Sequence, residues 1–303
     1  MSVIGIPRAL YYFHYYPLWK TYLEGLGFKV VFSSPTNKET LDCGLSTCVD
    51  GMCLPVKAYV GHVLMLARAG VDLIFVPKLV SVSRDEYICP NFLGLPDLVG
   101  QYLPPGTRLL SPVLDGRRGP KALKASYLRF GRQFAPERVV CGSWEEAEKQ
   151  QRLFERSGQR RIGAAPGPTL LVLGPRYLLA DDYLSGSLLK ILEHLGLRVL
   201  TPAAFTVDQT DEKPVSLVKP FFWTEVRQMW KSVEKAGGAV QGLVTAAPFG
   251  CGAQVLFGVL VRDWLDGRRL PILELHYDEH TSEVGMRTRL EAFFDLLERR
   301  EWA

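Results

Sequence analysis

The chain has 303 residues, of which 47% are hydrophobic and 22% charged, and its formal net charge is +4. A domain usually takes about 100–200 residues, so this length predicts two lobes. The basic residues are scattered and form no stripe with interleaved aromatics, which argues against a nucleic-acid partner. The apolar runs fall short of the ~20 residues that span a bilayer, which argues against a membrane partner. The opening stretch MSVIGIPRAL lacks the features of a signal peptide, so we expect a cytoplasmic protein.

Short β-rich runs alternate with longer amphipathic runs through the first third of the chain. In order they are VIGIPRAL, YYFHYYPLWKTYLEGLG, FKVVFSS, PVKAYVGHVLMLARAG and VDLIFVPK. Gly27 and Gly70 stand where helix C-caps are expected. This alternation predicts a parallel sheet in an N-terminal α/β lobe over residues 1–116.

The pattern turns helical and charged over residues 117–165, which predicts a helical connector with Ser143 as a helix N-cap. The segment GAAPGP, residues 163–168, is the predicted hinge. A second series of strands and helices predicts a C-terminal α/β lobe over residues 166–303. The expected fold class is α/β, with two Rossmann-like lobes built on parallel sheets.

Three distant cysteines share one local setting, a turn with Gly or Pro between an apolar run and a helix-like run. They are Cys53 in GMCLPVKAYVGH, Cys89 in RDEYICPNFLG and Cys251 in AAPFGCGAQ. A thiolate there faces the positive end of a helix, which lowers its pKa and favours metal binding. Sites in open α/β sheets form beyond the carboxyl ends of strands, so we expect the three to converge between the lobes. For each cysteine alone, a small buried hydrophobe is the competing interpretation.

The absence of any C-x-x-C pair excludes zinc ribbons and the close-spaced ferredoxin pattern. Cys43 and Cys48 in LDCGLSTCVDGMC are predicted as loop thiols, with a fourth ligand or a larger cluster as the alternatives. Cys141, which ends the run ERVVC before a helix start, is predicted as a structural cysteine. Lys57 falls in the first turn of a helix beginning near Pro55, where it would offset thiolate charge or lie on a solvated surface.

The histidines give weaker signals. His62 lies two turns along the same helix and is either part of that site or a satisfied core histidine. His276 and His280 in LELHYDEHTSEVG have metal-compatible types, but their segment looks like a strand end and loop. The glycine pattern at GCGAQV is interrupted and no phosphate-binding P-loop motif exists, so neither NAD nor ATP binding is predicted.

Four stretches together resemble the D-component superfamily of 2-hydroxyglutaryl-CoA dehydratase, particularly its small activase-related branch. They are CLPVKAYVGH, GVDLIFVPK with Cys89 beyond it, APFGCG and YDEHTSEVGMRTRLEAFFD. The resemblance spans nearly the whole chain. It implies two Rossmann-like lobes with a [4Fe–4S] cluster between them, held by Cys53, Cys89 and Cys251, with Lys57 beside it.

The same resemblance implies a low-potential electron supplied by an ATP-dependent activator protein or a related cluster-bearing subunit, in a homo- or heterodimer. We therefore expect an iron-sulfur electron-transfer or reductase subunit related to 2-hydroxyacyl-CoA dehydratase components. Three protein ligands would leave one iron open to substrate. The alternatives are a double-cubane [8Fe–9S] reductase of small molecules, a scaffold or maturation partner, and a protein that binds a small ligand between its lobes.

Overall fold

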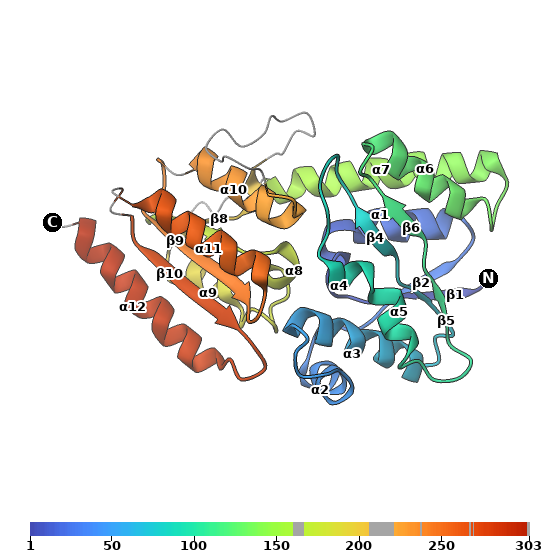
Figure 1. Ribbon diagram of the computed structural model, residues 1–303, viewed down its shortest axis with the longest axis horizontal. Coiled ribbons are helices and arrows are strands. Elements are labelled where there is room, and N and C mark those ends of the chain that lie inside the picture. Colours follow the sequence, from blue (N-terminus) through green and yellow to red (C-terminus); the bar gives the residue numbers. More distant parts are fainter. Residues whose placement is uncertain (160–166, 206–220, 237, 267, 269, 302–303) are drawn as a thin grey trace. The chain divides into compact units, whose positions relative to one another are not determined.

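The computed structural model describes residues 1–159, 167–205, 221–236, 238–266, 268 and 270–301. The chain divides into two compact units, Met1–Arg156 with Phe221–Thr224 and Ser157–Pro220 with Glu225–Ala303. Each unit has its own four-stranded parallel sheet, which confirms the predicted α/β class with Rossmann-like lobes (Figure 1).

The first sheet belongs to the N-terminal unit. Its strands lie in the order β2 (Lys29–Phe32), β1 (Val3–Ile6), β3 (Leu73–Phe75) and β5 (Arg108–Leu110). Beyond Pro77 and Pro112 the last two strands resume as a second parallel pair, β4 (Lys78–Ser81) and β6 (Val113–Asp115). Proline has no N–H for the ladder, so the sheet is interrupted at these two positions.

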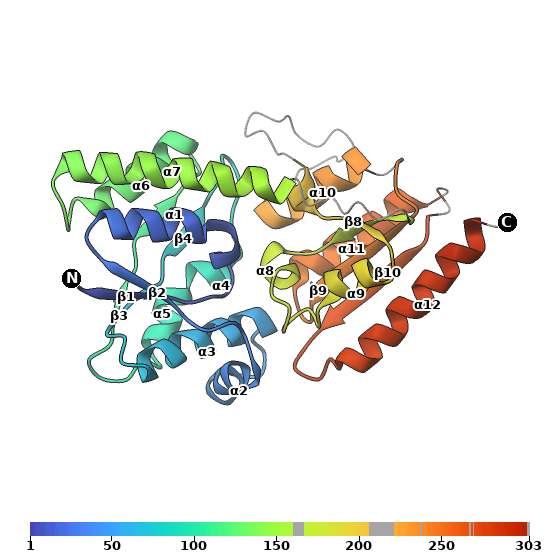
Figure 2. The same ribbon diagram turned by 180° about the vertical axis from the view of Figure 1, so that it is seen from behind.

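Helices cover both faces of the first sheet. They are α1 (Tyr12–Gly25), α2 (Lys38–Thr47), α3 (Leu54–Arg68), α4 (Pro90–Leu93), α5 (Leu95–Gly100), α6 (Pro120–Gly131) and α7 (Glu137–Gln159). Figures 1 and 2 show α1, α6 and α7 along one face and α3 and α5 along the other. The Tyr22 ring packs edge-on against Tyr127 and Trp144, and its hydroxyl donates to the Tyr127 carbonyl at 2.6 Å. These buried aromatics join α6 and α7 to α1.

Two boundary predictions have clear outcomes. Gly27 and Gly70 follow the last residues of α1 and α3 with φ of +96° and +79°, so their role as helix C-caps is confirmed. The prediction for Ser143 is wrong, because α7 already begins at Glu137. The Ser143 hydroxyl instead donates to the Val139 carbonyl one turn earlier, at 2.7 Å. The predicted hinge residues 163–166 lie outside the described residues.

The second sheet has the strand order β10 (Ile272–Tyr277), β9 (Gly242–Pro248), β7 (Thr169–Leu173) and β8 (Arg198–Leu200). Its helices are α8 (Arg176–Leu179), α9 (Leu188–His194), the 3-10 turn Pro202–Ala204, α10 (Thr224–Ala236), α11 (Gly252–Leu265) and α12 (Glu283–Glu301). Figures 1 and 2 show α10 and α11 on one face of this sheet and α9 and α12 on the other. The ring of Trp230 meets that of Phe257 between α10 and α11.

Candidate functional site

The three predicted cysteine ligands occupy the same structural position. Cys53 is the N-cap residue of α3, Cys89 that of α4 and Cys251 that of α11. Each side chain is half-buried. The residue just before a helix faces the unsatisfied N–H groups of the first turn, which favour a negatively charged sulfur. Sequence reasoning therefore placed all three correctly at helix starts.

Cys53 is positioned by a tight pair of helices. At the contact between α2 and α3, a Cβ on Gly44 would collide with the carbonyl oxygen of Lys57, and one on Gly61 with that of Thr40. Only glycine permits this approach of two backbones. The pair fixes the short turn that carries Cys53 into α3.

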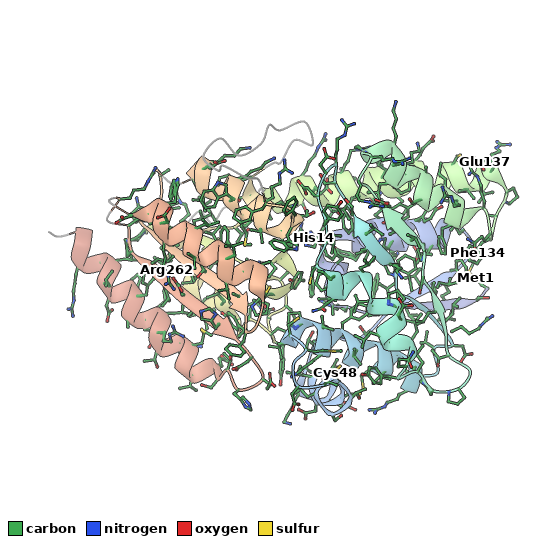
Figure 3. All side chains as sticks on the ribbon, in the orientation of Figure 1. Met1, His14, Cys48, Phe134, Glu137 and Arg262 are labelled. Atoms are coloured by element: carbon green, nitrogen blue, oxygen red, sulfur yellow. The ribbon has the colours of Figure 1, made fainter. Side chains whose placement is uncertain are left out.

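Cys43 and Cys48 are not loop thiols, so that prediction is wrong. Cys43 lies inside α2 and Cys48 is its C-cap, and both are buried at the contact with α3, where Figure 3 shows Cys48. Burial raises the pKa of the Cys48 thiol, and the nearby Lys57 charge opposes this shift. The loop interpretation failed because the α2 sequence has little apolar periodicity of its own.

Lys57 lies in α3 as predicted, but its surroundings differ from the surface alternative. Its side chain is only 2% exposed, which is rare for lysine. Its charge acts on the Cys48 thiol, so it lies on the side of α3 that faces Cys48, which we call the cysteine-bearing side of α3. A buried cation here can offset negative charge that gathers near the start of the helix.

Cys89 lies on a loop that is held by a distant segment. The Tyr87 amide donates to the Phe222 carbonyl at 2.7 Å, and the Thr224 amide donates to the Tyr87 carbonyl at 3.1 Å. These bonds form an isolated parallel bridge two residues before the cysteine. Phe221–Thr224 thereby belongs to the first unit, although the chain around it belongs to the second.

Cys251 follows the central strand β9, whose residues are all buried. A tight turn with φ of +75° at Gly250 leads into it. In this sheet β8 and β9 lie on opposite sides of β7, and ligands of open α/β sheets bind at such a reversal. The predicted lowering of its pKa is wrong, because burial raises the pKa of the Cys251 thiol and the backbone amides of Gln254 and Ala253 only partly oppose this.

The described residues, the three cysteines included, contain no metal-ligand group. No three His, Cys, Asp or Glu side chains in this part of the chain gather into a group that could hold a metal ion. Cys141 lies half-buried within α7 and its thiol donates to Glu137 at 3.6 Å. His276 is the last residue but one of β10 and His280 lies in the following turn, as the strand and loop interpretation predicted, and both are exposed.

The three cysteines divide between the units. Cys53 and Cys89 belong to the first unit and Cys251 to the second. Their convergence on one cluster stays a prediction. The interpretation of His62 as a satisfied core histidine is confirmed, since this buried side chain has a hydroxyl partner at each ring nitrogen.

A comparison with protein families matches residues 3–205 to the CoA enzyme activase uncharacterised domain (DUF2229). The chain belongs to this family. The matched part covers more than half of the chain and includes Cys53, Cys89 and Lys57, whereas Cys251 lies beyond it. The activase-related character expected from the sequence is thus shown at the level of the DUF2229 family.

No curated protein matches the chain. Among solved structures, it is similar to the laminin-binding protein Lbp of Streptococcus pyogenes at 11% identity and a TM-score of 0.25, covering 98% of each chain. It is similar to ZnuA at 10% identity and a TM-score of 0.30, covering 98% of this chain and 99% of that one. It is also similar to the vitamin B12 binding protein BtuF of Vibrio cholerae, at 10% identity and a TM-score of 0.25, covering 98% of this chain and 97% of that one. No conclusion follows from TM-scores this low. No helix in the described ranges combines the length and apolar character needed to cross a membrane.

Proposed function

We propose that this protein is a cytoplasmic iron-sulfur electron-transfer or reductase subunit, related to 2-hydroxyacyl-CoA dehydratase components. It accepts low-potential electrons from an ATP-dependent activator protein and works in a homo- or heterodimer. One observation carries the proposal: Cys53, Cys89 and Cys251 each stand at the N-cap of a helix, half-buried. Membership of the family described as the CoA enzyme activase uncharacterised domain supports it.

The donor chemistry of these three positions fits an iron-sulfur cluster. Thiolates are the usual cluster ligands, and a bound cluster supplies one-electron transfer. Partial burial restricts water around each sulfur, while the amides at the helix start favour its anionic form. Metal binding also overcomes the raised pKa of Cys251, because a coordinated thiol is deprotonated.

Lys57 has a supporting role in this proposal. A cluster with thiolate ligands carries negative charge, and each added electron increases it. A cation on the cysteine-bearing side of α3 favours the reduced form electrostatically. Because the Lys57 side chain is buried, water screens this interaction less than it would on the surface.

The test is iron and acid-labile sulfide per chain after anaerobic reconstitution, with the EPR spectrum of the reduced form. The variants Cys53→Ser, Cys89→Ser and Cys251→Ser are each expected to lose most of the iron while keeping the far-UV CD spectrum of the unaltered protein. Cys141→Ser is the matched control, because this half-buried cysteine lies inside α7 and is not an N-cap residue. Iron content that is the same in all four variants contradicts the proposal.

Two further measurements separate the alternatives. Cys43→Ala and Cys48→Ala are expected to retain iron, and iron loss in either would indicate a fourth ligand or a larger cluster. An iron content near twice that of a single cubane would favour the double-cubane reductase. A chain that takes up no iron under any anaerobic condition would favour the scaffold or maturation partner.

A further inference from the structure

An exposed surface of the first unit is formed by the two loops that follow β4 and β6. The Asp85 amide donates to the Arg117 carbonyl at 3.4 Å, so these loops lie side by side. The Tyr87 amide donates to the Phe222 carbonyl at 2.7 Å, which adds a third segment of the same unit. We name this area the Arg118 surface. Its members are the exposed residues Arg84, Tyr87, Arg117, Arg118, Lys121 and Phe222.

Positive charge dominates the Arg118 surface. Among the described residues, Arg84, Arg118 and Lys121 have no ion-pair partner. Arg117 pairs with Asp115, with 2.6 Å between the Arg117 Nη2 and Asp115 Oδ2 atoms. With this pair neutral and one further cation opposed by Asp85, two positive charges remain in excess. Such an excess attracts a negatively charged binding partner.

The cations at the start of α6 do not stabilise the helix. Lys121 lies in its first turn, which contains no acidic residue, and Arg118 lies just before its N-cap residue Gly119. The positive end of a helix dipole disfavours nearby cations. Folding of this unit alone therefore gives no reason for Arg118 and Lys121 to be basic. A negatively charged partner would convert their repulsion into attraction.

Two aromatic side chains lie beside the cations. Tyr87 is 45% exposed and Phe222 is 59% exposed, and an isolated parallel bridge holds their backbone segments together. The pKa of the Arg117 guanidinium is raised first by its hydrogen bond to Asp115 and also by one to Tyr87, so the Tyr87 ring reaches the charged rim. Aromatic residues and arginine are enriched in protein–protein interfaces, where they provide much of the binding energy.

We propose that the Arg118 surface docks an acidic surface of a partner protein, with Tyr87 and Phe222 as apolar anchors and Arg118 and Lys121 as ion-pair partners of its carboxylates. A second copy of this chain is disfavoured as the partner, because two chains of net charge +4 repel each other.

The negative charges within the surface favour a protein over other polyanions. Nucleic acids and anionic membranes present closely spaced phosphates, which Asp85 and Asp115 would repel. A protein partner can instead place its carboxylates opposite the cations and avoid these two residues. The proposal uses neither the cysteines nor iron, so it stands separately from the proposed electron-transfer function.

The test is the fluorescence anisotropy of a labelled peptide of ~20 residues, leucines spaced among glutamates, titrated with the full-length chain. We expect saturable binding that weakens between ~50 and ~200 mM salt, because salt screens exposed charges. Combining Arg118→Gln with Lys121→Gln is expected to weaken binding about fivefold or more. Phe222→Ser should have a similar effect, because it removes an aromatic anchor. The matched control combines Lys29→Gln with Arg68→Gln, which removes two exposed charges at the amino end of the first sheet.

Several results would overturn the proposal. Absence of saturable binding, or an equal loss in the two double variants, would mean attraction to net charge alone. Tighter binding of a thymidine oligonucleotide, or of vesicles of phosphatidylcholine and phosphatidylglycerol, lost in the Arg118 and Lys121 double variant, would assign the surface to nucleic acid or to a membrane. If Phe222→Ser alters the far-UV CD spectrum, the double variant decides: unchanged peptide binding there contradicts the proposal.

Discussion

The two units have sheets with corresponding strand orders but position their cysteines differently. In each, the first strand has the second on one side and the third on the other, giving β2-β1-β3-β5 and β8-β7-β9-β10. In the second unit the chain passes from the central strand β9 through one turn to Cys251. In the first unit, Cys53 needs the added helix α2, and Cys89 needs a strand pair that continues past the sheet. The sheet of the second unit positions Cys251 directly, whereas Cys53 and Cys89 depend on elements added to the sheet of the first unit.

This difference predicts that the first unit depends more strongly on single positions. The additions contribute little apolar periodicity of their own, so close contacts hold them. The second unit relies on a sheet whose central strand is entirely buried. Substitutions at the special positions of each unit test this contrast.

The largest effect is expected at the contact between α2 and α3. Gly44→Val places side-chain atoms where the backbone of Lys57 lies, so the two helices must separate. We expect a loss of about 3 kcal/mol or more in unfolding free energy, together with faster hydrogen exchange in peptides from α2 and α3. Gly142→Ala is the control, since Gly142 lies in α7 with open space around its missing Cβ and alanine favours helix. Equal exchange in both variants would contradict the dependence on Gly44.

The next effect is a pH dependence centred on the first unit. The unfolded chain protonates His62 near its ordinary pKa of 6.5, whereas the folded chain does so only near a pKa of about 4. Between these values the unfolded state binds more protons, so stability is full above 6.5 and falls as the pH falls toward 4. The expected loss between about pH 8 and pH 5 is about 2 kcal/mol.

Urea unfolding at several pH values measures this slope. His62→Gln should flatten it, whatever that variant does to the absolute stability. His194→Gln, which changes an exposed histidine in the second unit, should keep it. A slope that survives in His62→Gln would assign the pH dependence to other groups.

The smallest effect is expected in the second unit, at the start of α9. Ser187 is the N-cap residue there with φ of +57°, and its side chain makes no capping hydrogen bond. Glycine relieves the left-handed strain but adds freedom to the unfolded chain, so Ser187→Gly should stabilise by only about 0.5 kcal/mol. Thermal unfolding measures the gain, and Ser187→Ala should show none. A loss of stability in the glycine variant would mean that the serine hydroxyl has a structural role.

Much of the fold was predictable because local signals agreed with it. Gly27 and Gly70 mark true helix ends, and the cysteine settings mark true helix starts. The helix α2 was missed because KETLDCGLST contains a glycine and few apolar residues, and its stability comes from a partner distant in the chain. The start of α7 was missed because its valines, Val139 and Val140, favour strands, whereas in the structure Val140 is buried beside Gly131 of α6.

The helix-start positions of the three cysteines were predictable, but their surroundings were not. A glycine-flanked cysteine before a helix is readable from sequence, whereas the burial that raises the pKa of Cys251 depends on packing. The hydrogen bonds that join Arg8, Ser33, Thr36 and His62 were missed because these residues come from three separate segments. Their sequence signal is weak, an arginine two residues after the first strand and hydroxyl residues one and four residues after the second.

The bridge between Tyr87 and Phe221–Thr224 also sets an order of events during synthesis. A ribosome makes the chain from its N-terminus, so Cys89 emerges long before the segment that holds its loop. The first unit cannot complete this loop until Thr224 has left the exit tunnel, by which time much of the second unit has also been made. A nascent chain ending at Arg156 would carry Cys53 and Cys89 with one of their two turns untethered. Any cluster that needs both turns in place would therefore be inserted only after Thr224 has been made.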